Sequence, residues 1–371
     1  MNVLVTDLRY RMALAAVRDL ADAGHTVYGL HFGSNTPPPA ALSRCLAGWT
    51  AAEDTEGASR AEATRREAER RSAVIFPVGA KTIAALAEQP ESSALVPTPT
   101  QLCLAGDKAR VLALAEQLGV ETPRSWDMPA AATLPAVVKY RDGERLALHA
   151  AQRYAVCGDR AQLENTWERM CGYAAAHGQE PPLIQEYIDG DGFGVSCVFD
   201  RESRPVSIIC HRRLREYPIT GGPSATCETI WDDGLVRRAL TLLSALEWRG
   251  IAMVEFRGTI NRPVLMEINP RIWGTFPLTR VSKSGFSDAY VRAAKGEQLQ
   301  GNAGPSYETG VKMGFCLSNL AAAAAYLTRL HLAKGFSAIH DAFSLPDGVL
   351  ESTDRRPGYA YLRQALLRRE R

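Results

Sequence analysis

Residues Ile251–Gly274 read IAMVEFRGTINRPVLMEINPRIWG and predict two strands joined by a short turn and followed by an exit loop. Glu255 ends the first apolar run, and Glu267 and Asn269 face the same side of the second strand, because they are two residues apart. Buried carboxylates are costly unless they are paired or bound to a cation. Two glutamates and an asparagine form an oxygen-ligand set suited to Mg²⁺, which usually also holds phosphate oxygens. The alternative, a surface hairpin with solvated carboxylates, does not explain why the intervening residues are apolar.

The composition predicts an ordinary globular protein. A chain of 371 residues can form two or three domains, and its net charge of +2 gives no basis for a nucleic-acid or membrane-surface partner. The eight cysteines lack CxxC spacing, which favours reduced, mostly buried thiols over disulfides or a zinc site. The N-terminus does not resemble a signal peptide, and no segment reaches the ~20 strongly apolar residues of a membrane helix. We therefore expect a soluble, cytoplasmic protein.

The chain begins with a strand–helix–strand pattern. Asn2–Thr6 and Thr26–Leu30 predict strands, and Arg11–Ala23 predicts the helix between them. The first turn, TDLRYRMA, has no glycine, so a G-x-G-x-x-G dinucleotide site is disfavoured. Arg60–Arg71 predicts a charged helix whose charges lie in solvent. Residues 1–99 are expected to form a small α/β domain.

Two lysines stand out in the next region. Asp107 is suited to cap a helix N-terminus, which places Lys108 in its first turn, and Lys139 closes the apolar strand Leu134–Lys139. Together with the oxygen-ligand hairpin they suggest a polyphosphate ligand, whose charge needs cations on several sides. The sequence contains no P-loop, no kinase motif and no recognisable Ser/His/Asp arrangement. The glycine-rich segment GDGFG, residues 190–194, reads as a turn between strands.

The combination of these motifs resembles the ATP-grasp superfamily over about residues 1–296. The resemblance is carried by GDK at Gly106–Lys108, VVK at Val137–Lys139, QEYI at Gln185–Ile188 and MEINPRIWG at Met266–Gly274. It is strongest for the carbamoyl-phosphate-synthase-like and biotin-carboxylase-like carboxylate–amine ligases.

The resemblance implies an α/β protein with the α+β ATP-grasp architecture. A pre-ATP-grasp βαβ domain would occupy residues 1–99, and an ATP-grasp domain with an antiparallel sheet would occupy residues 100–300. A small lid subdomain would span about residues 133–187. Residues 301–371 would form a helical C-terminal extension.

The resemblance also implies roles for individual residues. The ATP phosphates would be held by Lys108 and by Lys139, the latter also catalytic. Adenine would be bound by the backbone of Glu186 and Ile188, with Gln185 and Tyr187 beside it. Mg²⁺, expected as two ions and replaceable by Mn²⁺, would be bound by Glu255, Glu267 and Asn269. The acyl phosphate or substrate carboxylate would be met by the catalytic Arg271, with Arg213 and Arg215 as further substrate candidates.

One segment departs from the family pattern. The lid strand of the family commonly continues VVKP into a loop of serines and glycines, whereas this chain reads VVKYRDGERL. Arg141, Arg145 and Arg153 in this segment are candidate phosphate or substrate contacts, and a surface-charged hairpin is the equally supported alternative.

The function implied is activation of a small carboxylate as an acyl phosphate and its coupling to an amine, with both substrates small molecules. Phosphorylation of bicarbonate or carbamate is the alternative within the fold. A non-catalytic ATP-binding regulatory protein is a third reading. The resemblance further implies a homodimer, and no motif identifies the carboxylate or the amine.

Overall fold

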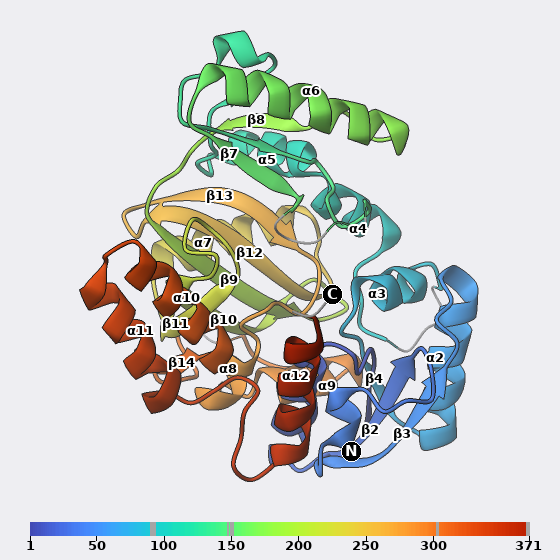
Figure 1. Ribbon diagram of the computed structural model, residues 1–371. Coiled ribbons are helices and arrows are strands. Elements are labelled where there is room, and N and C mark those ends of the chain that lie inside the picture. The colour runs from blue at the N-terminus through green and yellow to red at the C-terminus, as the bar shows by residue number, and fades with distance from the viewer. Residues whose placement is uncertain (90–93, 147, 149–151, 302–303, 369–371) are drawn as a thin grey trace.

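A computed structural model describes residues 1–89, 94–146, 148, 152–301 and 304–368. Three sheets follow one another along the chain, and the helices between Cys316 and Ser344 pack beside the last of them (Figure 1). The N-terminal sheet is parallel and the largest sheet is antiparallel, which confirms the predicted fold class. The domain limits inferred from the sequence stay predictions.

The N-terminal region is a parallel sheet in the order β3-β2-β1-β4. Its strands are β1 (Asn2–Val5), β2 (Thr26–Phe32), β3 (Leu46–Ala52) and β4 (Val74–Phe76). Its helices are α1 (Arg11–Asp22), α2 (Gly57–Arg71) and α3 (Ala80–Ala87), with the short 3₁₀ turn η1 (Pro39–Leu42) after β2. The predicted strand–helix–strand opening is confirmed.

The prediction that α2 presents only solvated charges is wrong. Arg60 is fully buried, lies over the ring of Phe32 at 3.7 Å and donates to Asp54 at 3.0 Å. Glu67 is also buried and accepts from Thr50. A guanidinium that is both stacked and paired can be buried, and charge density along a helix does not reveal such partners.

The second sheet forms a small lobe at the top of Figure 1. Its strands, in the order β5-β8-β6-β7, are β5 (Ser125–Trp126), β6 (Ala136–Lys139), β7 (Tyr154–Cys157) and β8 (Leu183–Glu186). Helix α6 (Arg160–Ala176) covers this sheet with Leu163 and Met170 packed on Val138 and Ile184. Helices α4 (Pro99–Gly106) and α5 (Lys108–Gln117) and the turn η2 (Pro129–Ala131) complete this part of the chain. Asp107 caps α5 by accepting from the Ala109 amide, as predicted.

The third sheet is the largest and has the order β13-β12-β9-β10-β11-β14. Its strands are β9 (Asp191–Phe199), β10 (Pro205–Glu216), β11 (Ser224–Ile230), β12 (Gly250–Thr259), β13 (Arg262–Asn269) and β14 (Lys312–Gly314). Helix α7 (Asp233–Ala245) and α5 bury one face of the sheet around Phe256. The hairpin predicted over Ile251–Gly274 is confirmed as β12 and β13.

The GDGFG segment is not a turn, contrary to the prediction. β9 already begins at Asp191, so Gly192 and Gly194 lie inside a strand. The basic segment after His211 likewise continues β10 as far as Glu216. Glycines inside a strand mark places where another group approaches closely, which local sequence patterns do not distinguish from a turn.

The chain beyond β13 contains helices, and it also supplies β14 to the central sheet. Its helices are α8 (Pro277–Val281), α9 (Phe286–Ala294), α10 (Cys316–Thr328), α11 (Leu332–Ser344) and α12 (Arg355–Arg368). Helices α10 and α11 follow each other almost directly along the chain. Leu330, with φ 61°, ends one helix before the other begins.

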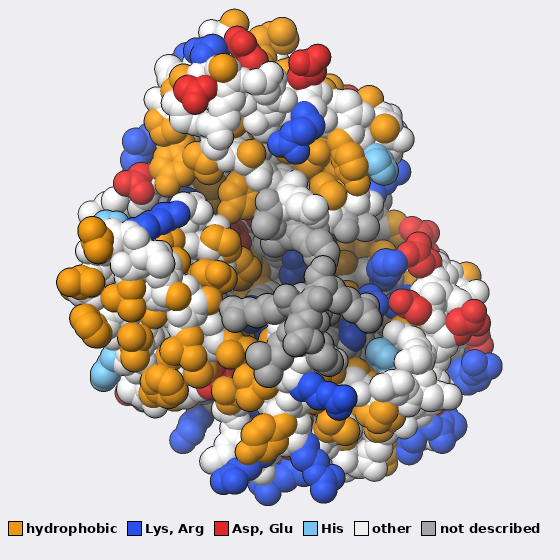
Figure 2. All heavy atoms as spheres, viewed as in Figure 1, with side chains coloured by type: hydrophobic (Ala, Val, Ile, Leu, Met, Phe, Trp, Pro, Cys, Tyr) orange, Lys and Arg blue, Asp and Glu red, His pale blue; other side chains and the backbone are white. Residues whose placement is uncertain are grey.

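Hydrophobic side chains gather on the surface of the α10–α11 hairpin (Figure 2). Leu330, Leu332, Phe336 and Phe343 are all more than half exposed there. None of the described helices is both long and apolar enough to cross a bilayer. All eight cysteines are free thiols, but only Cys157, Cys197, Cys210 and Cys227 are buried, so the prediction of mostly buried thiols holds for half of them.

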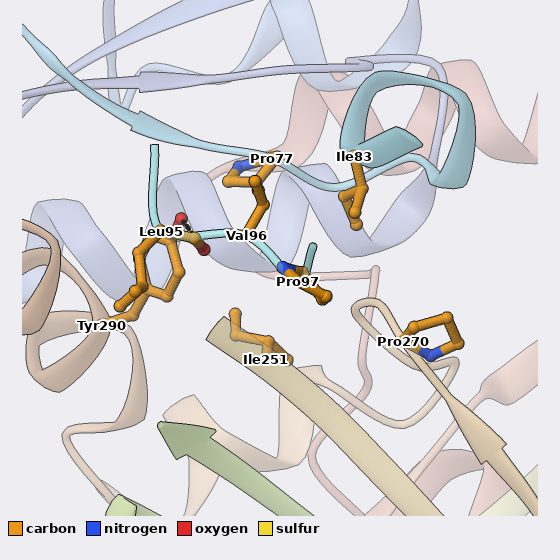
Figure 3. A pocket seen from close by; sticks show the side chains of 8 residues that line it. All are labelled: Pro77, Ile83, Leu95, Val96, Pro97, Ile251, Pro270 and Tyr290. Carbon is orange, nitrogen blue, oxygen red and sulfur yellow. Dashed lines mark hydrogen bonds between the residues drawn. The ribbon is translucent and has the colours of Figure 1, made fainter. Parts of the chain in front are cut away.

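An apolar seam joins the N-terminal sheet to the base of the β12–β13 hairpin (Figure 3). Val96 and Pro97 meet Ile251 at the start of β12 and Pro270 just beyond β13. The Tyr290 hydroxyl on α9 donates to the Leu95 carbonyl oxygen at 2.9 Å. The cavity enclosed here measures only about 10 Å³, room for about one water molecule. The seam is therefore a packing contact that fixes the hairpin against the N-terminal domain.

Candidate active site

One face of the central sheet changes from apolar to polar along its strands. Ile251 and Met253 pack into the core shared with the N-terminal domain, and the next two side chains on the same face of β12 are Glu255 and Arg257. Glu255 stands directly opposite Glu267 in the β12–β13 ladder, and Met253 stands opposite Asn269. Opposite residues share a face, so the two glutamates and the asparagine gather on one surface. The alternation read from the sequence is thus realised.

The neighbouring strands bring cations to this face. Gly194 lies between Glu255 and His211 in the ladder, and Gly192 lies between Arg257 and Arg213. The Arg213 guanidinium reaches Glu255 at 2.7 Å and Glu216 at 3.3 Å. A Cβ on Gly192 would stand 2.9 Å from Arg213 Cδ, so the arginine lies over a residue that has no side chain.

The carboxylates carry opposite electrostatic perturbations. Burial raises the pKa of Glu255, the negative Glu267 adds to this, and Arg213 opposes it. Burial would also raise the pKa of Glu267, but the Lys108 ammonium, 3.0 Å away, holds it at about 2. Burial disfavours the charged form of Arg213, yet Glu255 and Glu216 raise its pKa overall. Glu267 is therefore an anion at neutral pH.

The donor set fits a divalent metal that keeps other ligands. Among the described residues no three His, Cys, Asp or Glu side chains gather closely enough for an all-protein site. Mg²⁺ is usually held by one or two carboxylates together with water and phosphate oxygens. Glu255, Glu267 and Asn269, whose amide donates to Glu267 at 3.0 Å, fit that pattern.

Lys108 and Lys139 approach the hairpin from two different elements. Lys108 is the first residue of α5 and pairs with Glu267. Lys139 ends β6 of the small lobe and makes no ion pair with the described residues. Burial, together with the nearby Lys108 charge, lowers the pKa of Lys139 to about 8, although Glu267 and Glu255 oppose this shift. A cation in that position is stabilised by a further anion.

Arg271 lies where the exit loop meets the small lobe. Its guanidinium donates to Glu144 at 2.8 Å and to the Asn269 side chain at 3.4 Å. Glu144 also accepts from Arg153 at 3.2 Å. Arg141 is paired with Asp107 at 2.8 Å. The acidic Glu144, which was missed in the sequence, thus links the small lobe to the exit loop.

Arg145 and the segment Gln185–Ile188, which is expected to bind adenine, already have partners within the protein. The Arg145 backbone amide donates to Asp142 at 2.9 Å. The Glu186 amide already donates to the Arg124 carbonyl oxygen, and the Ile188 carbonyl oxygen already accepts from Arg257 at 3.1 Å. Gln185 is buried, with its amide donating to Ser125. Tyr187 is half-buried.

Arg215 does not join Arg213. The ladder between β10 and β11 shifts register between these two residues, so Arg215 stands beside Thr226 rather than on the face of Arg213. It donates to Asp341 and to Asn319, both at 2.7 Å, and thereby ties α10 and α11 to the sheet. His211 is buried against Thr275 at 3.1 Å, and burial lowers its pKa to about 3.

Residues 179–314, which contain the whole β9–β14 sheet, match the model of a family described as "ATP-grasp in the biosynthetic pathway with Ter operon". The chain has the ATP-grasp fold. The resemblance predicted from the sequence is thereby confirmed.

Solved structures agree with the ATP-grasp fold. A biotin carboxylase complex with β-γ-ATP from Campylobacter jejuni superposes with a TM-score of 0.64 at 16% identity, covering 84% of this chain and 74% of that one. Phosphoribosylamine–glycine ligase from Thermotoga maritima gives 0.62 at 15% identity, covering 84% and 78%. An ADP complex of N5-carboxyaminoimidazole ribonucleotide synthetase gives 0.63 at 13% identity, covering 89% and 85%. No protein of curated function matches the sequence.

Some residues of the candidate site were not predicted from the sequence. Glu144 and Arg257 carry no recognisable signal in the sequence, and only their contacts in the folded chain with Arg271 and with the Ile188 carbonyl oxygen reveal them. Gly192 and Gly194 could be noted in the sequence, but their structural role depends on side chains of the neighbouring strand that lie over them.

Proposed function

We propose that this chain is an Mg²⁺-dependent ligase that uses ATP to activate a small carboxylate and then couples it to an amine. The ligases and the nucleotide complexes among the structures of the same fold support the reaction class and the nucleotide. Their low identity leaves the substrates to be found.

One observation supports this proposal most strongly. Two lysines, Lys108 and Lys139, lie close to two glutamates, Glu255 and Glu267. Lys108 already pairs with Glu267, whereas Lys139 forms no ion pair within the described part of the chain and burial lowers its pKa. Phosphate oxygens of ATP would supply an anion for Lys139. Bound Mg²⁺ would neutralise phosphate charge beside Glu255, Glu267 and Asn269, with Mn²⁺ as an alternative ion and two ions expected.

The other roles follow from the positions of the side chains. The backbone groups of Glu186–Ile188 that are not yet engaged would meet adenine, with Gln185 supporting this edge from the core. Arg271, at the exit loop, would receive the substrate carboxylate in exchange for Glu144. Arg213 would neutralise charge next to Glu255.

The reaction would proceed in two balanced steps. A carboxylate oxygen attacks the γ-phosphorus of ATP, which forms an acyl phosphate and releases ADP. The amine nitrogen then attacks the acyl carbon, the C–O bond to phosphate breaks, and the amine loses one proton. Lys108, Lys139 and Arg271 would hold the anionic groups in place and neutralise developing charge. The small lobe, carrying Lys139, would exclude water from the acyl phosphate.

Bicarbonate is the alternative acceptor, because biotin carboxylases are among the structures of the same fold and one of them holds bicarbonate. A homodimer is also proposed, since one of these carboxylases is described as a dimer. A cytoplasmic location stays an expectation.

The deciding experiment measures ADP release with Mg²⁺ and ATP across panels of carboxylates and amines, with bicarbonate included. Release that requires both a carboxylate and an amine supports the ligase. Release with bicarbonate alone would replace the ligase by the alternative. Tight ATP binding without release in any panel would favour a regulatory nucleotide-binding protein.

A further inference from the structure

Arg11 is a half-buried cation that forms no ion pair with any residue described by the structure. It is the first residue of α1, and its guanidinium lies 4.1 Å from the ring centroid of Phe315. In the part of the chain that the structure describes, its side chain makes no hydrogen bond or ion pair. Arg18 on the same helix contrasts with it, because that guanidinium donates to Asp354 and to the Val349 carbonyl oxygen.

Stacking on Phe315 does not satisfy the Arg11 guanidinium. A cation–π contact uses the face of the guanidinium and leaves its five N–H donors in the plane. Asp347 is near enough to raise the pKa of Arg11, but burial outweighs it and lowers that pKa. The Asp347 carboxylate is already occupied by the backbone amides of Val349 and Leu350, at 2.7 and 2.6 Å.

A second unmet polar group lies beside Arg11. The hydroxyl of Tyr361 on α12 is buried and finds no hydrogen-bond partner among the described residues. Arg11 and Tyr361 interact electrostatically, and burial raises the pKa of this tyrosine. The N-terminus of α1 contributes positive partial charge to the same region, because its N-cap residue Tyr10 provides no side-chain acceptor for the first backbone amides. An anion at this point would accept from both side chains and face the positive end of the helix.

The position adjoins the candidate active site. A Cβ on Gly274 would stand 3.3 Å from Arg11 Nη2, and Gly274 ends the exit loop that carries Arg271. Arg271 is directed to Glu144 of the small lobe, whereas Arg11 is directed to Phe315. Cys227, which stands opposite Arg213 in the sheet, interacts with both Arg213 and Arg11. Arg271 of the exit loop and Arg11 of α1 therefore face different parts of the site region.

We propose that Arg11 and Tyr361 bind a carboxylate group of a substrate, distinct from the carboxylate that is phosphorylated. This inference rests on the proposed ligase function, and it narrows the substrates to those with a spare carboxylate. An α-amino acid acting as the amine and a dicarboxylic acid acting as the acyl donor share that chemistry.

The test is calorimetric binding of matched ligands to the full chain with Mg²⁺ and a non-hydrolysable ATP analogue. One series pairs α-amino acids with their amides, and the other pairs dicarboxylic acids with their monoamides. We expect wild type to prefer the free acids in one series, which identifies the source of the carboxylate. Arg11→Gln should weaken acid binding about tenfold or more and leave amide binding unchanged. Tyr361→Phe should weaken acid binding about threefold without lowering the melting temperature.

Arg9→Gln is the matched control, because Arg9 precedes the same helix but is paired with Asp54. It should bind the acids as wild type does. Equal acid binding by wild type and Arg11→Gln would overturn the subsite, as would failure of wild type to bind any acid of either series. Acid binding that depends on Arg11, but without ADP release in any panel, would keep the subsite and reject the ligase.

Discussion

The Arg213 guanidinium on β10 donates to the Glu255 carboxylate on β12 at 2.7 Å, although β9 lies between the two strands. Neighbouring strands are about 4.8 Å apart, so the arginine spans about 10 Å of sheet. It can do so because Gly192 and Gly194 leave the surface of β9 bare. The glycines therefore belong to the site, since they allow a cation from one strand to neutralise a candidate metal ligand on another.

Replacing Gly194 by alanine should destabilise the fold. The new Cβ would stand 2.1 Å from His211 Cε1, and His211 is buried and held by Thr275. Overpacking of this kind costs about 1–3 kcal/mol in the free energy of unfolding. Chemical denaturation of Gly194→Ala measures the loss.

Gly172→Ala is the control for that measurement. Gly172 lies in α6, and a Cβ there would meet nothing within 4 Å. Alanine in an open helical position should raise the free energy of unfolding by about 0.5–1 kcal/mol. Equal effects of the two substitutions would contradict the close approach of His211 to β9.

The sequence predicted the parts of the site that depend on local pattern. Strand alternation identified Glu255, Glu267 and Asn269, and helix capping by Asp107 identified Lys108. The sequence pattern did not show which of Arg213 and Arg215 faces the candidate site, because simple strand alternation places both side chains on one face. A bulge between the two arginines turns Arg215 to the opposite face of the sheet, and this bulge arises from the pairing of β10 with β11.

Long-range contacts account for the rest. Glu144 and Arg271 are 127 residues apart in the sequence, and no local sequence pattern predicts that they form an ion pair. Arg60 looked like a surface charge, since its partners Asp54 and Phe32 come from neighbouring strands and loops.

ATP affinity should depend on pH through Lys139. Its pKa is about 8 in the free protein, and a bound phosphate anion raises the pKa of a neighbouring ammonium. Affinity is therefore fully present below pH 8 and falls as pH rises through the free-state value, where binding takes up a proton. Calorimetry in buffers of different protonation enthalpy at about pH 8.5 measures that uptake.

Lys139→Arg is the comparison, because arginine stays charged over this range. It should bind ATP without proton uptake. The same uptake in both proteins would assign the titration to another group.

Arg215→Met should loosen the C-terminal helices while leaving nucleotide binding intact. Its guanidinium holds Asp341 and Asn319, and its loss leaves the half-buried Asp341 without its cation. Removing one partner of such a pair costs about 3 kcal/mol. Thermal unfolding and proteolysis of α10–α11 measure this. Unchanged stability combined with lost ATP binding would instead place Arg215 in the site.

Glu144→Gln should increase the affinity for the activated carboxylate in the absence of nucleotide. Glu144 occupies Arg271 in this structure, and an anionic substrate must compete with it. Neutralising the competitor should lower the dissociation constant about threefold, because the contact is partly exposed. Weaker binding of the carboxylate in this variant would mean that Glu144 supports the substrate rather than competing with it.

The central claim is that the β12–β13 hairpin holds Mg²⁺ against ATP phosphates, and the Mg²⁺ dependence of ATP affinity tests it most directly. Glu267→Gln removes a carboxylate from the set, and Glu121→Gln, which removes an exposed partner of Arg262 on the same hairpin, is the control. Circular dichroism checks that both variants are folded. Mg²⁺ should tighten ATP binding about tenfold in wild type and in Glu121→Gln, and should have no effect in Glu267→Gln. A full Mg²⁺ effect in folded Glu267→Gln would contradict the account.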